Sequence, residues 1–132
     1  MINDVLTAIT RKLSSTFPEC DIYDDKVPQD FKLKSFFVLL LNPTFIPGMD
    51  KRYRVTLPFD VHYWGTSQRD RNDMAFKLHQ ALRQVETLDN NKLIGKEMSG
   101  EHVDDVLHFF VTYDLNLTEI ETKVLMEILE LK

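Results

Sequence analysis

The sequence has little glycine, proline or cysteine. Its 132 residues include four glycines, five prolines and one cysteine, and this composition excludes collagen-like repeats and long flexible linkers. The single cysteine, Cys20, has no second cysteine in the chain with which to form a disulfide, and no zinc ligand set surrounds it. No histidine or lysine adjoins it in the sequence to activate its thiol, so we expect a buried structural residue and not a nucleophile.

Long hydrophobic runs are also missing. The longest unbroken apolar run is Phe36–Leu41, six residues, whereas a membrane-spanning helix needs about 20. The first residues, Met1–Asp4, lack the basic stretch and apolar core of a signal peptide. We therefore expect a soluble, cytosolic protein with no membrane partner. The chain is too short for two cores, so residues 1–132 are expected to form a single domain.

The sequence has no excess of positive charge. Sixteen lysines and arginines stand against 21 aspartates and glutamates, which gives a formal net charge of −5. Binding to nucleic acid through its phosphates requires a basic surface, so we expect no sequence-specific nucleic acid partner. A basic patch of four arginines is the feature that would favour DNA, but it is weakened because only one aromatic side chain, Trp64, is placed to stack among them. These arginines are Arg52, Arg54, Arg69 and Arg71.

The charges are unevenly distributed along the chain. Residues 51–83 hold seven basic and three acidic side chains, whereas residues 84–132 hold four basic and eleven acidic ones. Two oppositely charged surfaces suit head-to-tail association of identical subunits, which closes into a ring when the rotation permits. This interpretation requires that the two regions do not face each other within one subunit.

Two segments alternate between apolar and polar residues. Every odd position is apolar from Tyr53 to Tyr63 and again from Leu107 to Leu117, which predicts two half-buried strands. Pro58 cannot donate to a ladder, so the first strand is expected to lie at an edge there or to carry a bulge. Phe36–Leu41 has no polar face and predicts a strand buried on both faces. Residues 32–41 are expected to pair with residues 52–64 as a hairpin with a long, proline-containing tip.

Helical spacing appears in two other segments. The first begins at Ile2 and must stop before Pro18. The second begins at a cap, Ser67, and is expected to end at 90–91. Its predicted core face consists of Ala75, Leu78, Leu82, Val85 and Leu88, and its outward side chains of Arg69, Arg71, Lys77 and Arg83.

Shorter elements complete the expected order. We expect a short extended piece at 20–23, a weak strand at 93–98 interrupted by Gly95, and an acidic loop at 101–105. For residues 118–132, a capped helix and a continuing strand both remain open.

Side chains with catalytic chemistry are scattered. His62 and His108 lie on the polar sides of the two alternating strands and His79 on the outer side of the second helix, so we interpret them as solvated or satisfied surface residues. His102 lies among acidic residues, but no spacing there makes ligands converge on a metal. There is no glycine-rich phosphate loop and no serine in a strand-to-helix elbow. We expect no enzyme and no catalytic, cofactor or metal site.

Three stretches carry a resemblance to a known family: Ile2–Val5, Tyr53–Tyr63 and His108–Tyr113. In these stretches the chain resembles the small tail-terminator proteins of tailed bacteriophages and prophages, in particular those of Gram-positive prophages. The order of elements is also similar: a helix, a long hairpin with a proline-bearing tip, an arginine-rich capped helix and a second hairpin. The resemblance extends over most of the chain.

The resemblance implies a fold and a function. The fold is α+β, with a mixed, mostly antiparallel sheet of about four to five strands and two helices packed on one face. The function is that of a non-enzymatic virion assembly protein that forms a homohexameric ring, in some cases only on the tube. The ring caps the head-proximal end of the tail tube, stops its polymerisation and helps to join tail and head. The implied partners are further copies, the tail tube protein and a head–tail connector protein, with assembly in the host cytoplasm.

Contacts in such a ring are expected on the loops at 42–51 and 101–105, because loops usually carry interactions. The candidate contact residues are Pro47, Lys51, Arg69, Arg71, Glu101, Asp104 and Asp105. Two alternatives stay open at this point: a head-closure or connector protein, and a small α+β binding module unrelated to phage.

Overall fold

The computed structural model describes residues 2–118. Its elements, in chain order, are α1 (Ile2–Thr16), β1 (Asp21–Tyr23), β2 (Ser35–Leu40), β3 (Thr44–Pro47), β4 (Arg52–Trp64), α2 (Gln68–Leu82), β5 (Gln84–Glu86), β6 (Lys92–Ile94), β7 (Lys96–Val103) and β8 (Val106–Thr118). Neither helix in this range is long and apolar enough to cross a membrane. The open interpretation of the C-terminal segment concerns residues 119–132, which lie outside the described residues.

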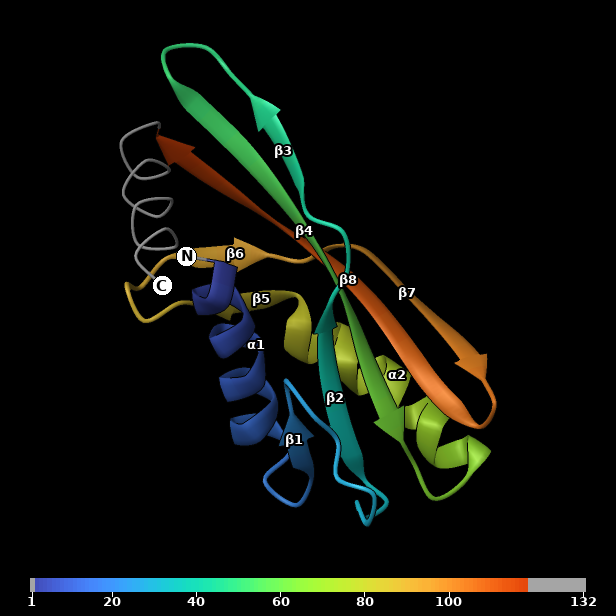
Figure 1. The fold of residues 1–132 in the computed structure, drawn as a ribbon. Coiled ribbons are helices and arrows are strands. Elements are labelled where there is room, and N and C mark those ends of the chain that lie inside the picture. The colour runs from blue at the N-terminus through green and yellow to red at the C-terminus, as the bar shows by residue number, and fades with distance from the viewer. Residues whose placement is uncertain (1, 119–132) are drawn as a thin grey trace.

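The strands form one open six-stranded sheet and a separate two-stranded one. The order in the large sheet is β1-β2-β4-β8-β7, and β3 pairs with β4 beyond the end of β2 (Figure 1). The β1–β2 pair is parallel and all other pairs are antiparallel. The predicted α+β fold with a mixed, mostly antiparallel sheet is confirmed, although the sheet has more strands than expected. The additional strand is β3, and β5 and β6 form a small sheet of their own.

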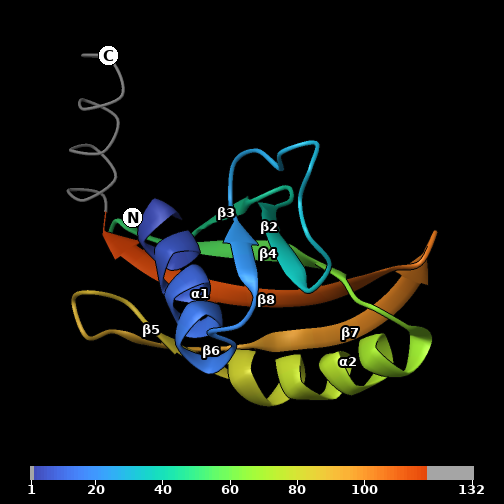
Figure 2. The same cartoon turned by 90° about the horizontal axis from the view of Figure 1, so that it is seen from below.

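The long strands β4 and β8 form the centre of the sheet. They pair antiparallel from Arg52↔Thr118 to Tyr63↔Leu107, and the predicted alternation is confirmed along both. Their apolar odd-numbered side chains join one hydrophobic cluster with α1 and α2, which lie on the same side of the sheet (Figure 2). The largest fully buried members include Tyr63, Tyr113, Phe36, Phe59, Ile9, Leu13, Leu57, Leu78 and Leu82.

The prediction that Phe36–Leu41 is buried on both faces was wrong. Phe36 and Val38 are fully buried, but Leu39 is exposed and Phe37 is only partly buried. A strand is buried on both faces only where elements pack on each side of the sheet. Here both helices lie on one side, so alternate residues of β2 point away from the core. The predicted pairing of this segment with residues 52–64 is confirmed.

The bulge expected at Pro58 as one alternative is absent, and the other alternative, an edge position, holds only locally, because β4 is a central strand with a gap on one side at this residue. β4 has partners on both sides, and its pairing with β8 runs through Pro58↔Thr112 without a shift. On the other side, β2 reaches only as far as Phe59 and β3 begins at Thr56. The Leu41 N–H donates to the Pro58 carbonyl at 2.8 Å. Because an antiparallel residue directs its N and O to the same neighbour, the missing N–H of the proline faces this break between two strands.

The second helix is capped as predicted but ends early. The Ser67 hydroxyl accepts from the Asp70 N–H at 3.1 Å, and the helix stops at Leu82 instead of 90–91. Val85 is buried from β5, while Leu88 is exposed. The Tyr113 hydroxyl donates to the Leu82 carbonyl, and the Gly95 N–H donates to that of Arg83 at 2.8 Å. Tertiary partners therefore satisfy helix-terminal carbonyls, as helix ends require.

The predicted acidic loop at 101–105 is mostly strand. β7 continues to Val103, and only Asp104 and Asp105 form the turn into β8. Both turn residues have positive φ angles, 50° and 62°. Two-residue hairpin turns with both central residues in this region match the twist of the strands, and aspartate tolerates the conformation. The predicted interruption at Gly95 is confirmed, because this residue separates β6 from β7.

Candidate functional site

The structure gathers the seven candidate contact residues into two groups at opposite ends of the sheet. Pro47 is the last residue of β3, and Lys51 lies in the turn between β3 and β4. The other five lie where α2 begins and where β7 turns into β8 (Figure 1). They are Arg69, Arg71, Glu101, Asp104 and Asp105. Residues that are more than 30 positions apart in the sequence thus share one end of the molecule.

The first end is a projecting hairpin, residues 42–54, which we call the arm. It contains the strand β3, whereas the sequence predicted a loop tip at 42–51. The β-branched and aromatic residues of Thr44–Ile46 are the signal that could have identified it. Every residue of β3 is exposed, and Met49 beyond it is 83% exposed. Exposed apolar side chains gathered on a projecting element are typical of a contact surface.

The second end, where α2 begins and β7 turns into β8, brings opposite charges together, and we call it the charged end. Arg71 Nη2 lies 3.7 Å from Asp105 Oδ1, with the arginine side chain 11% exposed and the aspartate 94% exposed. The expectation that Arg71 faces away from the protein was therefore wrong, whereas Arg69 is exposed as predicted. Part of the basic middle and part of the acidic end of the chain face each other within one subunit. This pair contributes little to stability because the aspartate is fully solvated.

Asp70 holds the connection between β4 and α2, which positions these arginines. Its Oδ2 accepts from the Tyr63 hydroxyl at 2.8 Å and from the Thr66 N–H at 3.0 Å. Partial burial alone would raise the pKa of Asp70, but these hydrogen bonds outweigh it and hold the pKa below its usual value. A Cβ at Gly65 would lie 2.7 Å from Asp70 Oδ2 and 2.8 Å from Tyr63 Cε2. Only glycine fits this close approach between strand and helix.

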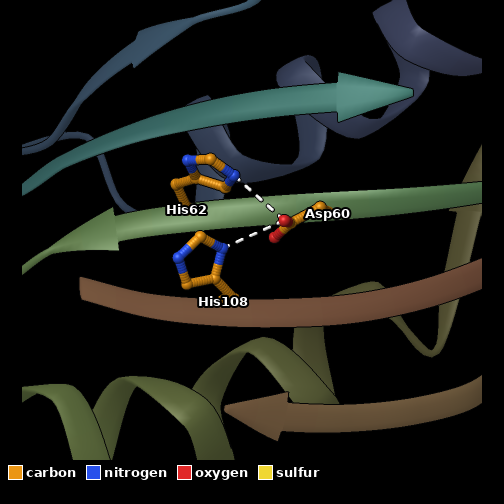
Figure 3. Close-up of polar contacts among 3 residues, drawn as sticks. All are labelled: Asp60, His62 and His108. Carbon is orange, nitrogen blue, oxygen red and sulfur yellow. Dashed lines mark hydrogen bonds and ion pairs between the residues drawn. The ribbon is translucent and has the colours of Figure 1, made fainter. Parts of the chain in front are cut away.

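A third group lies on the face of the sheet opposite the helices. Asp60 and His62 are two residues apart on β4, and His108 pairs directly with His62 from β8. Asp60 Oδ2 lies 3.0 Å from His62 Nε2 and 3.0 Å from His108 Nδ1. Figure 3 shows both imidazole rings turned toward this one carboxylate. Their ligand atoms all lie within 4.8 Å of one another, so the three side chains could hold a metal ion.

Aromatic and aliphatic neighbours shield this cluster. Asp60 is 7% exposed and is paired in register with Leu39 on one side and Phe110 on the other. The ring of Phe37 meets His62 edge-on at 5.5 Å between centroids. Burial by itself would raise the pKa of Asp60, but the hydrogen bonds to the two histidines hold it below its usual value.

The sequence did not predict this cluster. His62 and His108 were expected to be separate surface histidines, and the metal considered was near His102, which is exposed and outside the group. The Asp-x-His spacing at 60–62 does place two ligands on one face of a strand. Nothing in the sequence, however, specifies the register that brings His108 beside them.

Cys20 is buried, as expected. Burial raises the pKa of its thiol to about 11, which keeps it protonated and unreactive at neutral pH.

Comparison with known proteins identifies the family. A family model described as phage tail terminator protein matches residues 4–124, a range that begins in α1 and includes every strand. A search of curated proteins found no match to this chain. The resemblance seen in the sequence is thereby confirmed at the level of the family, while a Gram-positive origin stays a prediction. We conclude that the chain belongs to the phage tail terminator family and has a structural role in a phage tail.

Proposed function

We propose that this protein caps the head-proximal end of a phage tail tube as a ring of identical copies. The ring stops further polymerisation of the tube and helps to join the tail to the head. The observation that carries this proposal is the family match over residues 4–124. The partners are five further copies in a homohexamer that forms on the tube, the tail tube protein and a head–tail connector protein. Assembly takes place in the host cytoplasm, and the ring stays in the virion.

The open sheet supports assembly into a ring. Among residues 2–118, β7 pairs on one side only, and so do β1 and β3 at the other border. Unpaired strand edges present backbone donors and acceptors that invite a further strand. Because the two borders differ, contact between them in neighbouring copies is heterologous, the type of interface that closes into rings.

The two ends of the sheet suit two kinds of contact. We assign the arm, with Phe45, Ile46 and Met49 exposed, to the last layer of the tube, because apolar side chains need a partner surface that excludes water. The charged end, with Arg69, Glu101 and Asp104 exposed, is assigned to the neighbouring subunit, where charge complementarity sets orientation.

Deletion of the gene from a phage or inducible prophage tests the proposed function. We expect tails of uncontrolled length without heads, and normal virions when the gene is supplied in trans, as measured by negative-stain electron microscopy. Tails of normal length without heads would instead indicate a head-closure protein. Normal virions after deletion would overturn the proposal.

A charge reversal tests the assignment of the charged end. Arg69→Glu is the informative variant, because Arg71 already has a partner within the chain. We expect the variant to form fewer rings than the wild type by sedimentation of chain mixed with purified tubes. Arg11→Glu is a matched control, since this arginine is exposed on α1, far from the charged end. Equal ring formation by Arg69→Glu and the wild type would remove the assignment.

A further inference from the structure

We propose that Asp60, His62 and His108 form a binding site for a divalent transition metal ion of the zinc type. The inference is independent of the proposed ring, because it rests only on side chains within one subunit. No complete metal-binding motif is present in the sequence. The register between β4 and β8 brings the third ligand, His108, beside the other two.

The geometry needs only a small adjustment to hold zinc. Zinc binds imidazole nitrogen and carboxylate oxygen at about 2.0–2.2 Å, so the ligand atoms of a tetrahedral site lie about 3.3 Å apart. Asp60 Oδ2 lies 3.0 Å from one nitrogen of each imidazole ring. The two nitrogens face the same carboxylate oxygen from adjacent strands (Figure 3), and all three ligand atoms lie within 4.8 Å of one another. An ion there replaces the two hydrogen bonds with three coordinate bonds and displaces the ring protons that made them.

A second observation points to a cation. Asp60 Oδ1 is buried and has no hydrogen-bond partner among the residues that the structure describes. An ionised carboxylate oxygen without a partner in a buried position is costly. A bound cation offsets this cost, because both oxygens of the carboxylate then lie next to positive charge.

The site has room for a further ligand. The side chains of His62 and His108 are 19% and 21% exposed. They alternate with the core residues of β4 and β8, so they lie on the face of the sheet opposite the helices. Water can therefore take a fourth position. Glu101 of β7 pairs in register with His108, so it lies on this same face and is the closest acidic neighbour across that strand pair.

The ligand types select the class of metal. Two imidazoles and one carboxylate suit zinc, cobalt, nickel or copper. Calcium and magnesium prefer six or more oxygen ligands, which this cluster does not offer. Bound zinc would tie β4 to β8 at the centre of the sheet and stabilise the folded chain by mass action.

The competing interpretation is a cluster that functions without metal, in which both imidazoles simply donate to Asp60. Calorimetric titration of the purified, chelator-treated chain with zinc chloride separates the two. We expect one zinc ion per chain and a melting temperature that rises with zinc. His62→Gln and His108→Gln should each lose at least the ~10–100-fold in affinity that removal of an outer-shell partner costs at metal sites.

Two other histidines provide matched controls. His79 and His102 are exposed and lie outside the cluster, so His79→Gln and His102→Gln should bind zinc like the wild type. No saturable binding by the wild type, or a loss confined to His102→Gln, would overturn the proposal.

A measurement on the wild-type chain tests the site even if the variants fail to fold. In a zinc titration followed by NMR, the ring signals of His62 and His108 should shift together and saturate at one equivalent. Cobalt in place of zinc should give the visible absorption of a site with imidazole ligands. Ring signals that stay unchanged while zinc binds elsewhere would contradict the assignment.

Discussion

The two faces of the β4–β8 ladder are built from neighbouring residues but differ in what covers them. Phe59, Val61 and Tyr63 are fully buried against α1 and α2, whereas Asp60 and His62 alternate with them and therefore point to the opposite face of the sheet. A single alternation of period two therefore produces a hydrophobic core on one face and a polar cluster on the other. One pair of strands therefore combines residues that stabilise the fold with polar residues that are not needed to build its core.

The largest effect is expected from the covered face. Phe59→Ala removes a ring that is fully buried, which should lower the free energy of unfolding by about 3–5 kcal/mol. Leu39→Ala, on the open face, should cost about 1 kcal/mol or less, because its side chain is already exposed. Urea unfolding of both variants checks the difference. Equal losses would mean that the open face is covered under the conditions of the experiment.

A smaller effect is expected where the covered face meets the end of α2. A Cβ at Gly95 would lie 2.5 Å from the Leu82 carbonyl oxygen and 3.0 Å from a Val111 methyl group. Gly95→Ala should therefore destabilise the protein by about 1–3 kcal/mol, measured by thermal or urea unfolding. Gly100→Ala is the control, because its Cβ would have its nearest neighbour at an ordinary 3.6 Å. If both variants lose the same stability, the close packing of Gly95 against the end of α2 does not explain the loss.

The smallest effect is expected on the open face, and it depends on pH. The pKa of Asp60 is lower in the folded protein than its usual value. The carboxylate therefore stabilises the fold fully above the unfolded pKa of about 3.9, and this contribution is lost as the pH falls through the folded pKa. Asp60→Asn, measured with a chelator present, should cost about 1–2 kcal/mol at pH 7.

The difference between wild type and Asp60→Asn should shrink as the pH falls from about 5 to 2. Denaturant unfolding at several pH values measures it, with Asp24→Asn, an exposed loop residue, as the control. A difference that stays constant over this range would show that the charge of Asp60 does not contribute.

Much of the fold was predictable because local patterns determine it. The perfect alternation in β4 and β8, the Ser67 cap and the Pro18 boundary each depend on neighbours in the sequence. The end of α2 was not predictable, because Tyr113 and Gly95 stop it from other parts of the chain. The strand β3 was missed because Pro43 and Pro47 at its borders resembled a loop.

The candidate sites likewise depend partly on local sequence and partly on contacts between distant parts of the chain. The charged residues of the second end were found individually from the charge asymmetry, but the pairing of Arg71 with Asp105 depends on how α2 lies against the β7–β8 turn. For the cluster of Asp60, His62 and His108, the Asp-x-His spacing at 60–62 was visible in the sequence, whereas the third ligand was not.

Taken alone, the order of residues determined which side chains of β4 and β8 share a face, because successive side chains of a strand point to opposite sides whatever the surroundings. It also determined where helices begin and which family the chain resembles. Only the tertiary structure decided that His108 stands beside His62, that β2 is covered on one side and that Pro58 meets a break between strands. These features depend on register and layer packing, which come from contacts between residues far apart in the chain.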